Sequence, residues 1–166
     1  MRHFDAAVDN LDERHARALG ELHPQLSPFV FELLDRLGGR FKLWDGWRGE
    51  AEQNAAAASG NSNASWGESP HNNLDAEDQP AALAADLVLD PRRVQVREAE
   101  TARRRGKPGW PNLWDDVAPD SLRAWADLEE QALAIGLERV WVYRRGVWQR
   151  DRPHVQHPKW LQLRTR

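Results

Sequence analysis

Three short segments of the chain each place a possible metal ligand among residues that would fix its position. They are Ser69-Pro70-His71, the apolar run that contains Asp86, and Asp151-Arg152-Pro153-His154. The chain has no cysteine, so any metal must be held by imidazole nitrogens and carboxylate oxygens. Two imidazoles and one carboxylate are a standard ligand set for catalytic zinc, with a fourth position left for water. The sequence therefore predicts a zinc site formed by His71, Asp86 and His154.

Asp151 is the candidate acid–base group of this site. It lies three residues before His154, so one turn of chain could bring its carboxylate beside a water on the metal. Each residue alone has a plainer explanation, because a lone His is usually a hydrogen-bonded structural residue and a buried Asp often caps a turn. Asp151 could cap the turn before Pro153, and Arg48 could be an ordinary ion-pairing residue at the surface. The prediction depends on the segments occurring together.

The order of these segments resembles that of the hedgehog-like zinc peptidases, a family that includes D-alanyl-D-alanine carboxypeptidases and phage L-alanyl-D-glutamate endolysins. A Ser-x-His segment, a Gly-x-Ala-x-Asp strand and a terminal Asp-x-Pro-His segment mark that family. Here they correspond to Ser69–His71, Leu83–Val88 and Asp151–Gln156. The segment Asp45–Gln53, DGWRGEAEQ, is similar to the family's Gly-Tyr-Arg-Ser-x-x-x-Gln element. The likeness covers most of the chain except residues 90–118.

The resemblance implies a zinc-dependent hydrolase of the peptidoglycan stem peptide. In this reading Asp151 is the base, Arg48 contacts the substrate and its developing oxyanion, and Ser69 and Gln53 lie on the substrate side of the site. The small size and the Asp-x-Pro-His form favour an L-alanyl-D-glutamate endopeptidase of the phage endolysin type. A D-alanyl-D-alanine carboxypeptidase and a catalytically idle zinc-binding domain are alternatives. A third is a binding module for glycan or nucleic acid built on the nine tryptophans, although these are more typical of core and cleft walls.

The spacing between the first two ligand candidates departs from the family pattern. The family separates its first His and its Asp by six residues, whereas residues 72–85 lie between His71 and Asp86. Asp78 keeps the short spacing, but its surroundings are polar and turn-like. Asp86 lies in a predicted strand, which would orient a ligand better, so we favour Asp86 over Asp78.

The surrounding sequence predicts helices, strands and loops that could bring these segments together. We expect helices at residues 10–19, 27–37 and 49–58, and a fourth helix that is N-capped by Asp120 or Ser121 and runs to 135. We expect strands at 41–44 and 84–89 and a hairpin formed by 139–143 and 147–148. Residues 59–73 should form a loop. We expect a single α+β domain over residues 1–166, with an irregular insertion at about 90–118. A short antiparallel sheet would carry the zinc site, with helices packed against it.

Composition limits the partners and the location of the protein. The formal net charge of −3 and the pI near 6.1 argue against a nucleic-acid-binding protein. The first residues lack the apolar segment of a signal peptide, and no stretch is long and apolar enough to insert in a membrane. We therefore expect a chain that is made in the cytoplasm, and we expect it to be a monomer. The resemblance to phage endolysins further implies that it reaches the cell wall through a holin. His157, three residues after His154, is expected to face solvent.

Overall fold

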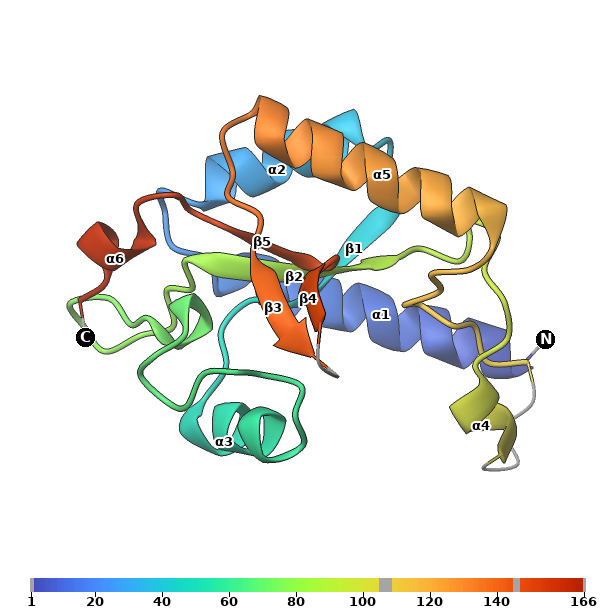
Figure 1. Ribbon diagram of the computed structural model, residues 1–166, viewed down its shortest axis with the longest axis horizontal. Helices are drawn as coiled ribbons and strands as arrows, with labels where there is room; N and C mark the ends of the chain where they lie inside the picture. Colours follow the sequence, from blue (N-terminus) through green and yellow to red (C-terminus); the bar gives the residue numbers. More distant parts are fainter. Residues whose placement is uncertain (1, 105–108, 145–146, 166) are drawn as a thin grey trace.

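A three-stranded antiparallel sheet in the order β1-β2-β5 lies at the centre of the molecule (Figure 1). The computed structural model describes residues 2–104, 109–144 and 147–165. Its strands are β1 (Phe41–Asp45), β2 (Ala84–Leu89) and β5 (His154–Gln156), with a separate hairpin of β3 (Trp141–Arg144) and β4 (Val147–Arg150). Its helices are α1 (Arg2–Gly20), α2 (Ser27–Arg36), α3 (Glu50–Ala58), α4 (Glu100–Arg104), α5 (Pro119–Ala134), α6 (Trp160–Leu163) and the 3₁₀ turn η1 (Pro70–Asn72).

The alternation of side chains along β2 separates the core from the candidate site. Ala85 and Leu87 join a buried apolar cluster together with residues of α2 and α5. Because successive side chains of a strand point to opposite faces, Asp86 lies on the other face of the sheet. The register pairs Asp86 with His154 of β5 on one side and with Asp45 of β1 on the other. One line across the sheet thus carries three residues that can bind cations or protons.

Helix α1 covers the outer edge of β1. The backbone N–H of Leu43 donates to Nδ1 of His15 at 3.0 Å, and the Arg14 side chain donates to the carbonyl of Trp44 at 2.6 Å. An open strand edge presents unpaired backbone groups, and these contacts satisfy two of them. The helix therefore fixes the strand that leads into the Asp45–Gln53 segment.

The predicted fold class is confirmed, since the described part of the chain is a small α+β structure with helices packed against a three-stranded antiparallel sheet. Two details differ. The first helix begins well before residue 10. The cap of α5 is Ala118 with Pro119 in the first turn, and not Asp120 or Ser121, because the Ser121 hydroxyl is turned away to the carbonyl of Gln95.

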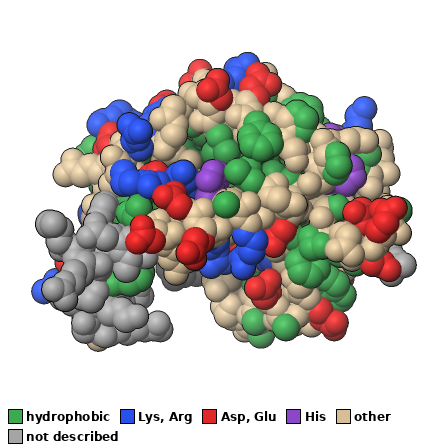
Figure 2. All heavy atoms as spheres, turned by 180° about the vertical axis from the view of Figure 1, so that it is seen from behind, with side chains coloured by type: hydrophobic (Ala, Val, Ile, Leu, Met, Phe, Trp, Pro, Cys, Tyr) green, Lys and Arg blue, Asp and Glu red, His purple; other side chains and the backbone are tan. Residues whose placement is uncertain are grey.

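The predicted hairpin forms, although its turn at residues 145–146 lies outside the described residues. The described residues of the segment 90–118, which exclude 105–108, are largely irregular apart from the short helix α4. Within the described residues, no helix is both long and apolar enough to cross a bilayer. Figure 2 shows acidic and basic side chains intermixed on the back of the molecule. Charges on that face are therefore neutralised locally instead of forming a field of one sign.

Candidate active site

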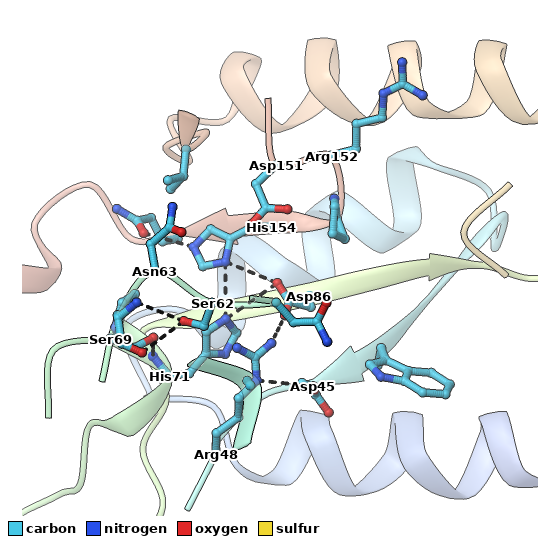
Figure 3. A pocket seen from close by; sticks show the side chains of 18 of the residues that line it. Asp45, Arg48, Ser62, Asn63, Ser69, His71, Asp86, Asp151, Arg152 and His154 are labelled. Atoms are coloured by element: carbon cyan, nitrogen blue, oxygen red, sulfur yellow. Dashed lines mark hydrogen bonds and ion pairs between the residues drawn. The ribbon is translucent and has the colours of Figure 1, made fainter. Parts of the chain in front are cut away.

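His71, Asp86 and His154 converge on one point from three separate elements (Figure 3). His71 comes from η1, Asp86 from β2 and His154 from β5. One ligand atom of each residue lies within 4.8 Å of the other two. All three are at least nine-tenths buried, with exposed fractions of 1%, 8% and 8%. The three residues named as zinc ligands from the sequence therefore form a group that could hold a metal ion.

The spacing of the three ligand atoms fits a small tetrahedral ion. Nδ1 of His154 lies 3.2 Å from both Nε2 of His71 and Oδ1 of Asp86, and Nε2 of His71 lies 3.6 Å from the same Oδ1. A zinc ion with bonds of about 2.0–2.1 Å would hold its ligand atoms about 3.3–3.4 Å apart. The observed separations lie close to that edge length.

Hydrogen bonds to the far ring nitrogens indicate which atoms face the metal position. The Nδ1–H of His71 donates to the carbonyl of Gly46 at 2.6 Å, and the Nε2–H of His154 donates to Oε1 of Gln156 at 3.0 Å. The Gln156 amide is oriented in turn, because its NH₂ group donates to Glu138 at 2.7 Å. Neutral rings in these tautomers direct two lone pairs at each other across 3.2 Å. That arrangement is repulsive unless a cation lies between them, so the donor set fits a metal.

The His71 segment is held from both sides. The hydroxyl of Ser69 accepts from the His71 backbone N–H at 3.3 Å and caps η1. A side chain at Gly46 would approach the carbonyl of Ala18 to 2.6 Å. Glycine is therefore required there for the chain to pass close to α1 and still present its carbonyl to His71.

Asp86 divides its two oxygens between the histidines and an arginine. Oδ1 faces His71 and His154, whereas Oδ2 accepts a hydrogen bond from Arg48. Burial raises the pKa of Asp86, but the two imidazoles and Arg48 outweigh it and hold that pKa well below its usual value. The carboxylate is thus ionised and available as a ligand.

Arg48 lies between two carboxylates. Besides Asp86, it contacts Oδ2 of Asp45 at 3.3 Å, and Asp45 also accepts from Arg14 at 2.6 Å. Burial lowers the pKa of Arg48, but the two carboxylates outweigh it and raise that pKa above its ordinary value. A β-bulge between Leu43 and Asp45 places Asp45 opposite Asp86 and thereby creates this position for the guanidinium.

Asp151 lies beside His154 and lines the same cavity (Figure 3). Its carboxylate is near enough to raise the pKa of both Arg48 and His154, where burial, the largest single effect, acts in the opposite direction. The turn that carries it is fixed by Arg139, which donates to the carbonyls of Arg152 at 2.6 Å and His154 at 2.9 Å. Asp151 is thus presented at the site by a braced turn.

The long interval between His71 and Asp86 is taken up by a small hairpin. The N–H of Asp75 donates to the carbonyl of Gln79 at 2.9 Å, and that of Ala81 donates to Asn73 at 3.1 Å. Asp78 lies at its exposed tip with a left-handed φ of 59°. The structure therefore brings Asp86, and not Asp78, to the two histidines.

Two sequence-based assignments need correction. Gln53 does not line the cavity, since its side chain is fully buried and donates to the Ser62 hydroxyl and the Ala64 carbonyl. Its role is to support the loop that forms one wall of the cleft, in place of the predicted substrate contact. His157 is buried instead of facing solvent, and its ring packs edge-on against Phe29 at 5.7 Å. It does not line the cavity either.

Gln156, Glu138 and Arg139 were not identified from the sequence. Gln156 lies two residues after His154 in β5. Because side chains of a strand alternate between its two faces, this spacing is the sequence signal that places Gln156 on the same face as the ligand. Nothing in the sequence pattern connects Glu138 to it, because their contact depends on an isolated bridge between the two backbones.

The three ligand residues line a cavity of about 1050 Å³. The cavity is also lined by the Ser62–Ala64 segment, Glu68 and Ser69, and by Trp44, Trp114, Asp116 and Arg152. Trp44 contacts Trp114, and Asp116 lies near Arg152. Figure 3 shows Asn63 and Ser69 on the side of the ligand group opposite to Arg152. The cleft therefore extends in both directions from the candidate metal position.

Comparisons with known proteins include a likeness to a solved structure. No family model and no curated protein sequence matches the chain. The structure is similar to the crystal structure of the L-Ala D-Glu endopeptidase ChiX from Serratia marcescens, with a TM-score of 0.49 and 19% sequence identity over 88% of this chain and 87% of that one. Because a likeness of this degree does not imply a shared activity, the function is inferred from the site residues themselves.

Proposed function

We propose that this chain is a zinc peptidase that hydrolyses an amide bond of the peptidoglycan stem peptide, the L-alanyl-D-glutamate bond in particular. The observation that carries the proposal is the convergence of His71, Asp86 and His154 at tetrahedral spacing, with their far atoms already hydrogen-bonded. The order of sequence segments around these residues supports the stem peptide as substrate.

The residues around the ligand group divide the hydrolysis between them. Zinc, when bound, supplies a Lewis acid that polarises a carbonyl and lowers the pKa of water. Asp151 accepts the proton of the attacking water and returns it to the leaving amine. Arg48 offers a guanidinium to the oxyanion that develops on the scissile carbonyl. Asp45 and Asp86 hold that guanidinium in place before the substrate arrives.

The shape of the cleft supports internal cleavage over removal of a terminal residue. An endopeptidase must accommodate chain on both sides of the scissile bond, and the cavity continues on both sides of the ligand group. A D-alanyl-D-alanine carboxypeptidase needs a closed end with a group for the terminal carboxylate.

Digestion of purified peptidoglycan, followed by mass analysis, tests the proposal. We expect about one zinc per chain from the single site, and fragments with a new N-terminal D-Glu. Asp151→Asn should keep its zinc and lose activity by about 100-fold or more. Asp78→Asn is the matched control and should change neither property. Release of free D-Ala would indicate the carboxypeptidase instead, and a chain that binds no zinc and releases nothing would contradict the proposal.

A further inference from the structure

The cleft continues beyond the ligand group to a pair of tryptophans, Trp44 and Trp114. Their ring centroids are 5.8 Å apart and their planes are inclined by 75°. The guanidinium of Arg14 lies over the Trp44 ring, 3.9 Å from its centroid. Trp114 is 40% exposed, so much of its indole is available to a molecule lying in the cleft. This end of the cleft therefore has an aromatic wall.

The loop that carries Trp114 is held rigidly by its neighbour Asp115. The Asp115 carboxylate is fully buried and accepts from the side chain and the backbone of Arg97, at 2.8 and 2.9 Å. Its carbonyl accepts from the indole N–H of Trp125 at 2.8 Å. Trp114 and Asp116 flank this anchor, so little ordering of the loop is needed when a ligand binds.

Polar groups border the aromatic wall. Asp116 and Arg152 approach to 3.9 Å, and their side chains are 63% and 47% exposed. A solvated ion pair of that length leaves hydrogen-bonding capacity on both groups for a ligand. Asp116 and Arg152 line the same cavity as Asp151, the proposed proton acceptor.

We propose that Trp114, Trp44, Asp116 and Arg152 form a subsite for an N-acetylated amino sugar, the ring to which the stem peptide is attached in peptidoglycan. The inference rests on the proposed function and adds a glycan contact to it. A sugar ring has an apolar C–H face that packs on an indole and a rim of hydroxyl and amide groups that bonds to charged side chains. The opposite end, with Ser62, Asn63 and Ser69, has small polar groups suited to peptide. The segment 109–118 would thus extend a peptide cleft into a glycan-recognising one.

Paired substrates test this subsite. One is the stem peptide with an acetyl cap, and the other is the same peptide attached to N-acetylmuramic acid. For the wild type we expect kcat/KM to be about tenfold higher on the sugar-linked peptide. Trp114→Ala should bring the two substrates to within about twofold with zinc content unchanged, and Trp114→Phe should retain part of the preference. Trp141→Ala, which removes an exposed tryptophan outside the cleft lining, is the control.

A binding measurement separates this inference from the proposed function. Titration calorimetry with the disaccharide of N-acetylglucosamine and N-acetylmuramic acid should show binding to the wild type and none to Trp114→Ala. Disaccharide binding without hydrolysis of either substrate would keep the subsite and overturn the peptidase. Hydrolysis of both substrates at equal rates, or an equal loss on both in Trp114→Ala, would overturn the sugar subsite and leave the peptidase intact.

Discussion

His154 presents Nδ1 to the candidate metal position because Gln156 occupies its other ring nitrogen. Glu138 holds Gln156 in turn, so two side chains in series determine the tautomer of this ligand. His71 is fixed by a backbone carbonyl instead, that of Gly46. A backbone partner cannot be removed by substitution, whereas the Gln156 amide can. The two histidines therefore differ in how sensitive they are to mutation.

Gln156→Leu removes the acceptor for the His154 Nε2–H. We expect zinc affinity to fall by about 10–100-fold, since partners of this kind orient metal-ligating imidazoles. Competition with a chromophoric chelator measures the affinity. Gln162→Leu, an exposed change on α6, should leave it unaltered. Equal zinc affinity in Gln156→Leu and the wild type would show that the amide does not fix the ring.

Asp45→Asn removes one of the two carboxylates that hold Arg48. We expect kcat to fall about tenfold with little change in zinc content, because the guanidinium then rests on Asp86 alone and is less well placed for the oxyanion. Steady-state kinetics with metal analysis provides the readout. Asp127→Asn breaks a comparable surface ion pair with Arg40 and should change neither kcat nor zinc content. Loss of zinc in Asp45→Asn would assign Asp45 to metal binding instead.

The candidate metal ligands could be predicted from the sequence, whereas several of the residues that hold them in position could not. His71, Asp86 and His154 stood out because each is a polar ligand type in a distinctive local setting. Gly46 and Glu138 support them through contacts that only the folded chain creates. Gln53 was misassigned because its place in a family-like segment gave no indication of burial.

At the scale of elements, α3 and the loop after it act as one wall of the cleft. The loop Ser59–Ser69 has no regular structure of its own, and the buried Gln53 amide of α3 bonds to it at two places. Asn72 of η1 also contacts Gln53, at 3.4 Å. One buried side chain thus connects the wall to the segment that carries His71.

Gln53→Leu should loosen this wall without touching the metal ligands. We expect KM to rise severalfold, zinc content to be retained, and the free energy of unfolding to fall by about 1–3 kcal/mol, because the half-buried Ser62 hydroxyl and Ala64 carbonyl lose their donor. Kinetics and urea unfolding give the two readouts. Gln79→Leu, in an exposed turn, is the control. A KM equal to that of the wild type would show that the wall does not contact substrate.

Asp12 is one of the residues that attach helix α1 to the rest of the molecule. Its carboxylate pairs with both Nη atoms of Arg92, at 2.7 and 2.9 Å, and with Lys42 at 3.2 Å. The hydrogen bond to Arg92 is the main cause that lowers the Asp12 pKa to about 2. A carboxyl group with a lowered folded-state pKa stabilises the protein above its unfolded pKa, and this stabilisation is lost as the pH falls through the folded value.

Asp12→Asn should therefore lower Tm at pH 7. The difference from wild type should shrink as the pH falls from about 4 to about 2 and disappear below that value. Thermal unfolding across that range measures it, with Glu13→Gln, a change of an exposed neighbouring carboxylate, as control. A Tm difference that persists unchanged at pH 2 would mean that the ion pairs of Asp12 do not hold α1.

The predicted elements were mostly correct because their signals are local. The apolar run at Ala84–Leu89 and the Ser27-Pro28 helix start need no tertiary information. The pairing of β2 with both β1 and β5 could not be predicted in this way, because it joins strands that lie between about residue 40 and about residue 155, and no local sequence pattern indicates which strands pair. The cap of α5 was misplaced because the hydroxyl of Ser121 is used by Gln95, far away in sequence.

For the whole molecule, the ligand group joins β2, β5 and η1 at a single point. Binding of zinc to the folded state alone should therefore stabilise all three together. Free zinc at about 100 times its Kd adds about 2.7 kcal/mol. For a chain of this length each kcal/mol shifts Tm by about 2–4 °C.

Chelation of the metal should accordingly lower Tm by about 5–11 °C. Differential scanning calorimetry with and without chelator measures the shift. His71→Ala should melt at the same temperature in both conditions, since it lacks one ligand of the group. A wild-type Tm that does not respond to chelator would argue against a bound metal.

The hairpin between Asn73 and Ala81 has a practical consequence for protein engineering. Its two ends are joined by backbone hydrogen bonds. A segment inserted at the tip would therefore leave these ends in place and would not displace Asp86. Exposed loop tips accept foreign segments best. The exposed positions 76–79 are therefore where a wall-targeting peptide or a reporter domain could be grafted while the ligand group keeps its geometry.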